Sequence, residues 1–141
     1  MLYFAYGSNL NVSQMHFRCP KAISYGGGYL NDWRLVFRNV ADIEPAEGEL
    51  LPVGFWEITD DCLATLDRYE GVESGLYSRV YINGMLTYRM NHTGISVPPN
   101  SYFKSILNGY QDFGLDDSYL HDARHMAMTE EYKNAKYANN G

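Results

Sequence analysis

The sequence has little cysteine, no long apolar run and no excess of positive charge. Its two cysteines, Cys19 and Cys62, match no metal-ligand or redox spacing, so we expect reduced thiols in a cytoplasmic protein. No apolar run approaches the roughly 18 residues of a membrane-spanning helix, which argues against a membrane protein. Lys and Arg number 11 against 17 Asp and Glu, and the net charge of −6 argues against a nucleic-acid partner.

What is present indicates one folded domain. The chain has 141 residues, of which 45% are hydrophobic and 20% charged, enough for a continuous core. We predict a domain over residues 1–128, followed by a polar tail over 129–141. Thirteen tyrosines favour a β-rich body with clefts lined by aromatic rings that carry hydroxyl groups.

The first ten residues combine a short apolar strand with a turn. Residues 2–6 favour extended backbone, Gly7-Ser8-Asn9 interrupts it, and Asn9 or Asn11 can cap a following helix. Such a turn leaves backbone N–H groups unpaired, which predicts a small pocket for an anion or carboxylate. On spacing alone, an ordinary strand–turn–helix explains the same residues.

The remaining patterns predict an α+β domain, in which a small, twisted, barrel-like mixed sheet is flanked by helices. Asn39 to Gly48 is polar and acidic and is predicted to be a loop. Asn83-Gly84 predicts a hairpin with a type I′ turn, and Gly71 a left-handed helix cap. The predicted strands are 2–6, 22–30, 33–38, 50–58, 76–82 and 85–90, and the predicted helices are 11–18, 60–69, 101–111 and 119–128.

Glu70 is the main candidate for acid–base chemistry. It ends a predicted helix, where the helix dipole disfavours a carboxylate, and burial there would raise its pKa toward neutrality. An exposed surface glutamate is the alternative. Ser8 as a nucleophile would need a histidine and a carboxylate that the sequence cannot place, and no G-x-S-x-G motif is present.

One histidine pair has the spacing of metal ligands. His121 and His125 stand four residues apart on a predicted helix, and Asp122 takes the place of the glutamate of H-E-x-x-H. No third ligand is evident, and we interpret the pair as part of a solvated helix face. We therefore expect no metal and no cofactor.

Two segments together resemble the γ-glutamylcyclotransferase family, including its AIG2-like members. They are Tyr3-Phe4-Ala5-Tyr6-Gly7-Ser8-Asn9-Leu10 and Leu66-Asp67-Arg68-Tyr69-Glu70-Gly71-Val72-Glu73-Ser74-Gly75-Leu76-Tyr77. The resemblance continues through Val53 to Trp56 and through Pro98 to Gly109, in the family's order. The double motif is far more specific than either half.

The resemblance implies an activity and a set of site residues. The substrate's α-amino group would attack its own γ-carbonyl to give 5-oxoproline and a free amine, with Glu70 as general acid and base. The substrate-binding residues would be Tyr6, Gly7, Ser8, Asn9, Leu10, Tyr77 and Tyr102. Because the attack is intramolecular, no protein nucleophile or cofactor is needed.

The resemblance leaves several alternatives open. A non-catalytic module of the same fold could bind a γ-glutamyl or amide ligand. Within the enzyme class, the γ-glutamyl group could be a protecting group removed from a biosynthetic intermediate, and a Ser8-dependent hydrolase is a further alternative. The expected partner is a small γ-glutamyl molecule, and a homodimer stays open since some relatives dimerise.

Overall fold

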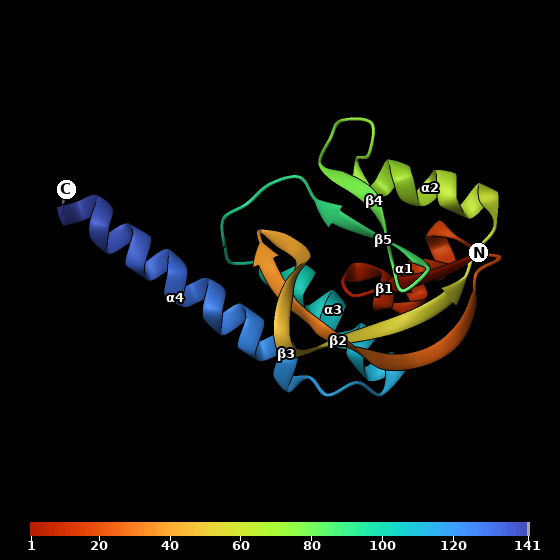
Figure 1. The fold of residues 1–141 in the computed structure, drawn as a ribbon, viewed down its shortest axis with the longest axis horizontal. Helices are drawn as coiled ribbons and strands as arrows, with labels where there is room; N and C mark the ends of the chain where they lie inside the picture. Colours follow the sequence, from red (N-terminus) through yellow and green to blue (C-terminus); the bar gives the residue numbers. More distant parts are fainter. Residues whose placement is uncertain (141) are drawn as a thin grey trace.

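The computed structural model describes residues 1–140, with side chains described as far as Lys136. Five strands form one sheet in the order β2-β3-β1-β5-β4, and helices pack around it (Figure 1). The predicted α+β class is confirmed. The strands are β1 (Leu2–Ala5), β2 (Ile23–Arg38), β3 (Val40–Glu57), β4 (Tyr77–Ile82) and β5 (Met85–Met90). The helices are η1 (Ser8–Leu10), α1 (Val12–Arg18), α2 (Asp60–Glu70), α3 (Asn100–Phe113) and α4 (Ser118–Asn140).

The short strand β1 lies at the centre of the sheet. It pairs antiparallel with β3, where Tyr3 lies opposite Trp56, and parallel with β5, where Tyr3 lies opposite Leu86. A central strand is buried on both faces, which explains why Phe4 and its neighbours form a continuous apolar run. The end of β1 therefore delivers the Gly7-Ser8-Asn9 turn to the middle of the molecule.

The predicted loop from Asn39 to Gly48 is wrong. β2 and β3 form one long hairpin in which Arg38 pairs with Val40, and Asn39 alone, with φ of 71°, reverses the chain. The two predicted strands 22–30 and 33–38 merge into β2, with a register shift between Asn31 and Trp33. The polar composition misled the prediction because Asp42 is buried in an ion pair with Arg38 (2.8 Å).

The local signals at turns and helix ends agree with the structure. Asn83 and Gly84 have φ of 53° and 78°, as a type I′ turn requires, and they join β4 to β5. Gly71 ends α2 in the left-handed conformation, with φ of 65°. The Asn11 side chain caps α1 by accepting from the Gln14 N–H (3.1 Å). Glu70 is therefore the last residue of α2.

The prediction of reduced thiols is wrong, because Cys19 and Cys62 form a disulfide. Cys19 follows α1 and Cys62 lies in the first turn of α2, and their Cα atoms are 5.1 Å apart. The pairing depends on how the two helices pack, which sequence spacing does not report. The two cysteines thus give no support to a cytoplasmic location.

The last helix passes the predicted domain boundary at residue 128 without interruption. α4 runs to Asn140, and Figure 1 shows its C-terminal half projecting away from the sheet. Glu131 fixes part of it by accepting hydrogen bonds from Ser96 and the Val97 N–H. The boundary itself stays a prediction, and Gly141 lies outside the described residues. None of the helices described, α4 included, is both long and apolar enough to cross a bilayer.

Candidate active site

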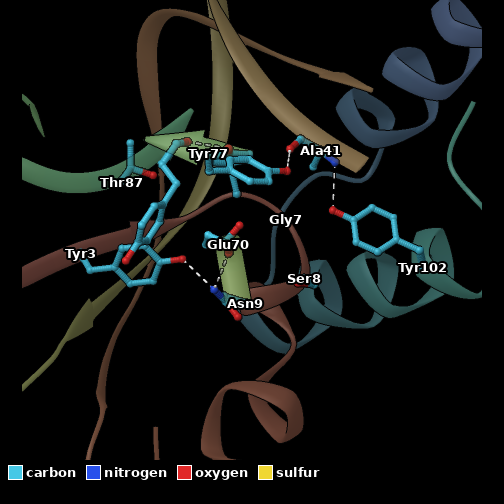
Figure 2. A pocket seen from close by; sticks show the side chains of 11 residues that line it. Tyr3, Gly7, Ser8, Asn9, Ala41, Glu70, Tyr77, Thr87 and Tyr102 are labelled. Carbon is cyan, nitrogen blue, oxygen red and sulfur yellow. Dashed lines mark hydrogen bonds between the residues drawn. The ribbon is translucent and has the colours of Figure 1, made fainter. Parts of the chain in front are cut away.

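A small cavity opens where the turn after β1 faces the end of α2. Figure 2 shows Glu70 at its centre, with the turn on one side and tyrosine side chains around it. The cavity is lined by Tyr3, Tyr6, Gly7, Ser8, Asn9, Ala41, Glu70, Tyr77, Thr87, Tyr88 and Tyr102. Tyr6 and Gly7 lie in the link between β1 and η1, and the other lining residues come from η1, α2, α3 and four strands of the sheet.

The turn after β1 lines this cavity and contains backbone donors that its short helix does not use. η1 begins at Ser8, so the N–H groups of Ser8 and Asn9 have no acceptor inside the helix. Gly7 is favoured by close approach, since a Cβ there would lie 3.1 Å from the Ala41 Cβ, tighter than most real contacts. The turn can therefore bind a carboxylate or carbonyl oxygen of a ligand.

The turn is held from behind by α3. Leu10 is fully buried, and α3 approaches it so closely that a Cβ on Gly109 would lie 2.6 Å from the Leu10 carbonyl carbon. The Asn11 amide also donates to the Ser105 carbonyl oxygen (3.1 Å). Leu10 consequently anchors the turn in the core and does not line the cavity.

Glu70 has the environment of a general base. Its carboxylate accepts a hydrogen bond from Asn9 Nδ2 (3.5 Å), and that amide also donates to the Tyr3 hydroxyl (2.9 Å). Burial raises the pKa of Glu70 to about 7, and the positive charge of Arg18 opposes the rise. A carboxyl group with that pKa can take and return a proton near neutral pH.

Of the five tyrosines that line the cavity, Tyr88 donates its hydroxyl proton to Asp67 (2.7 Å), and the other four hydroxyls divide into two kinds. Tyr6 donates to the Tyr88 carbonyl (2.6 Å) and Tyr77 to the Ala41 carbonyl (2.5 Å), so these two oxygens can only accept from a ligand. Tyr102 accepts from the Ala41 N–H (2.9 Å) and Tyr3 accepts from Asn9, so both keep a proton to donate. Burial raises the pKa of all four, so they stay neutral.

The tip of the β2–β3 hairpin is fixed so that Ala41 meets Tyr77 and Tyr102. Asp42 pairs with Arg38 and accepts a hydrogen bond from the Met90 N–H of β5 (3.0 Å). The buried pair therefore ties the tip to the other side of the sheet. Figure 2 shows Ala41 between the two tyrosine hydroxyls that bond its backbone.

Most of the predicted site residues meet in this cavity. The structure brings together Glu70 with Tyr6, Gly7, Ser8, Asn9, Tyr77 and Tyr102, and leaves Leu10 in the core. The sequence did not identify Tyr3, Ala41, Thr87 or Tyr88, although strand position alone brings Tyr3 and Tyr88 there. Ser8 accepts a hydrogen bond from Arg18 (3.1 Å), and none of the hydrogen bonds among described side chains joins it to a histidine.

The predicted histidine pair lies outside this cavity. His121 is 3.7 Å from Asp117, one turn earlier on the same helix, and its ring packs 5.6 Å from that of Phe103. No group of three or more candidate metal ligands occurs among the described residues.

Comparison with known proteins identifies the family. The family model of "Gamma-glutamyl cyclotransferase, AIG2-like" matches residues 3–100, which include β1, the turn, α2 and Glu70. The chain belongs to this γ-glutamylcyclotransferase family. It is thus a member of an enzyme family, and the motifs that carried the resemblance lie within the matched region.

Individual relatives agree with this assignment. The γ-glutamylcyclotransferase of Bos taurus is 31% identical over 140 residues, covering 84% of this chain and 74% of that protein. The Homo sapiens protein of the same name is 30% identical over 139 residues, with the same coverage. A solved structure of a γ-glutamyl cyclotransferase superposes with a TM-score of 0.75 at 28% identity, covering 88% of this chain and 86% of that one.

Proposed function

We propose that this protein is a γ-glutamylcyclotransferase that converts a γ-glutamyl amino acid or amine to 5-oxoproline and the free amine, with Glu70 as general acid and base. One observation carries the proposal: a carboxyl group with a pKa of about 7 faces a turn of free backbone N–H groups across a small cavity. The names of the relatives supply the γ-glutamyl substrate class.

The reaction begins with proton transfer. Ionised Glu70 removes a proton from the substrate's α-ammonium group, whose pKa lies above that of Glu70 because a free α-carboxylate stands beside it. The hydroxyl oxygens of Tyr6 and Tyr77 accept from the same ammonium group, because their own protons are already donated. The raised pKa of Glu70 narrows the gap to that of the ammonium group and so lowers the free-energy cost of the transfer.

Ring closure then needs no protein nucleophile. The neutral α-nitrogen attacks the γ-carbonyl carbon of the same molecule, a C–N bond forms, and negative charge develops on the carbonyl oxygen. Backbone N–H groups of Ser8 and Asn9 donate to that oxygen. The γ-amide C–N bond breaks as Glu70 gives that first proton to the departing nitrogen. Glu70 then takes the second proton from the ring nitrogen, which leaves the neutral lactam of 5-oxoproline, and passes it to the released amine, which departs as an ammonium ion.

A product screen tests the function. The protein is incubated with a panel of γ-glutamyl amino acids and γ-glutamyl amines, and 5-oxoproline is measured by mass spectrometry. Glu70→Gln should lose 100-fold or more in rate, roughly what a general base contributes. Glu73→Gln is the matched control, because Glu73 is exposed and only three residues away. A binding module would instead return every ligand intact.

A further inference from the structure

Arg18 lies outside the cavity lining, yet it contacts the turn that forms one of its walls. Its guanidinium donates from Nη1 to Asn9 Oδ1 (2.5 Å) and to Ser8 Oγ (3.1 Å). Nη2 donates to Gln14 Oε1 (3.2 Å) within α1. The guanidinium carbon also lies 4.1 Å from the centroid of the Tyr69 ring, next to Glu70 on α2. One cation thus links α1, the turn and α2.

The contact with Arg18 decides which way the Asn9 amide points. A guanidinium can only donate hydrogen bonds, so the amide oxygen must face Arg18 and Nδ2 must face Glu70. The reversed amide would place its NH₂ against the cation and its oxygen against the carboxylate, which is unfavourable on both sides. Asn9 is 3% exposed, so water cannot compensate for that reversal.

The position of Arg18 is fixed relative to Glu70 by the covalent structure as well. Cys19, the next residue, is bonded to Cys62 in the first turn of α2, and Glu70 is the last residue of that helix. The guanidinium group of arginine is planar and its N–H donors point in fixed directions, so it can bind several acceptors at once in one orientation. Lysine carries the same charge without this geometry.

Arg18 also supplies the charge that acts on the Glu70 carboxylate. The other titratable groups facing Glu70 are five neutral tyrosines: Tyr3 from β1, Tyr6 from the link after β1, Tyr77 from β4, Tyr88 from β5 and Tyr102 from α3. The positive charge of Arg18 lowers the pKa of Glu70 against the larger effect of burial. The same side chain therefore orients the site and favours the ionised base.

We propose that Arg18 is a positioning residue of the active site, which aligns the Ser8–Asn9 turn with Glu70 and keeps Glu70 available as the base. The expected effect of Arg18 on kcat rests on the function proposed above. Its expected effect on the titration of Glu70 does not. Loss of the positive charge of Arg18 and loss of its planar guanidinium should therefore have different consequences.

The test compares Arg18→Gln and Arg18→Lys with the wild type. The Glu70 carboxyl is titrated by ¹³C NMR, its signal being identified by its absence in Glu70→Gln, and kcat/KM is measured against pH. Arg18→Gln should move the titration midpoint and the acidic limb of the profile to higher pH by about 0.5 to 1 unit. Arg18→Lys should keep the midpoint but lower kcat about tenfold, because the turn is less well held.

Arg68→Gln is the control for loss of charge. Arg68 is exposed on α2, two residues before Glu70, and its side chain donates to Thr65. Water screens an exposed charge, so this variant should move neither the midpoint nor kcat. The proposal is overturned if folded Arg18→Gln keeps the wild-type midpoint and kcat/KM. If the wild type makes no 5-oxoproline at all, the proposed function fails, and the NMR midpoint still decides the link between Arg18 and Glu70.

Discussion

Gly109→Ala tests how the substrate-binding turn is held in place. A Cβ at this position would lie 2.6 Å from both the carbonyl carbon and the Cβ of Leu10, and 2.7 Å from the Asn11 nitrogen. Two of these atoms are backbone, so relief requires α3 or the turn to shift by roughly 1 Å. The substitution should gain about 1 kcal/mol in helix propensity. Overpacking of this kind costs about 3 kcal/mol, so we expect a net loss near 2 kcal/mol.

The assay is thermal unfolding combined with kinetics. A loss of about 2 kcal/mol corresponds to a fall in Tm of about 6–8 °C for a domain of this size. Because the shift displaces Ser8 and Asn9, kcat/KM for 5-oxoproline formation should fall about tenfold or more. Asn108→Ala, at an exposed neighbouring position on α3, should leave both quantities near the wild-type values. A Gly109→Ala variant that is more stable than the wild type, with unchanged kcat/KM, would refute this reasoning.

Three further predictions follow from the charges and covalent bonds around the site. First, kcat/KM should fall tenfold per pH unit as pH drops below about 7, since protonation removes the Glu70 base; a profile flat from pH 5 to 8 contradicts the role. Second, the folded-state pKa of Glu70 lies above its ordinary 4.5, so the folded protein binds the extra proton and its stability falls as pH rises from about 4.5 to 7. Glu70→Gln should therefore be about 3 kcal/mol more stable than the wild type at pH 8 and equally stable at pH 4. Urea unfolding measures both differences. Equal stability of the two proteins at both pH values would contradict the raised pKa of Glu70. Third, the disulfide joins cysteines 43 residues apart, so replacing Cys19 and Cys62 with alanine should lower the free energy of unfolding by up to about 4 kcal/mol. A thiol titration of the unreduced, denatured wild type checks the bond itself, and two free thiols would show that it is absent.

The sequence predicted those parts of the fold that local backbone chemistry determines. Asn83-Gly84 and Gly71 adopt the left-handed conformations that their turn and cap require. Helix α2 ends one residue beyond the predicted range 60–69, at the predicted Gly71 cap, so Glu70 could be placed at the end of the helix. The long β2–β3 hairpin was missed because its reversal needs one residue, Asn39, and because a buried ion pair involving Asp42 looks like loop composition.

The site was only partly predictable, because contacts between segments far apart in the sequence help to form it. The two motifs identified Glu70 and the turn, because the family resemblance joins segments about sixty residues apart. Tyr3 lines the cavity from β1, and Arg18 lies outside the lining but contacts the turn from α1. Neither the Tyr3–Asn9 nor the Arg18–Asn9 hydrogen bond has a sequence signature. The disulfide was missed on the same grounds, since it reflects how α1 packs on α2.

The central claim is that Glu70 converts a γ-glutamyl substrate to 5-oxoproline without a protein nucleophile. The most direct measurement is 5-oxoproline formation from the γ-glutamyl panel at pH 8, by wild type, Glu70→Gln and Glu73→Gln in parallel. We predict product from the wild type and Glu73→Gln and a loss of 100-fold or more in Glu70→Gln, roughly the contribution of a general base. Product formed by Glu70→Gln at the wild-type rate, or none by the wild type from any substrate, would contradict the account.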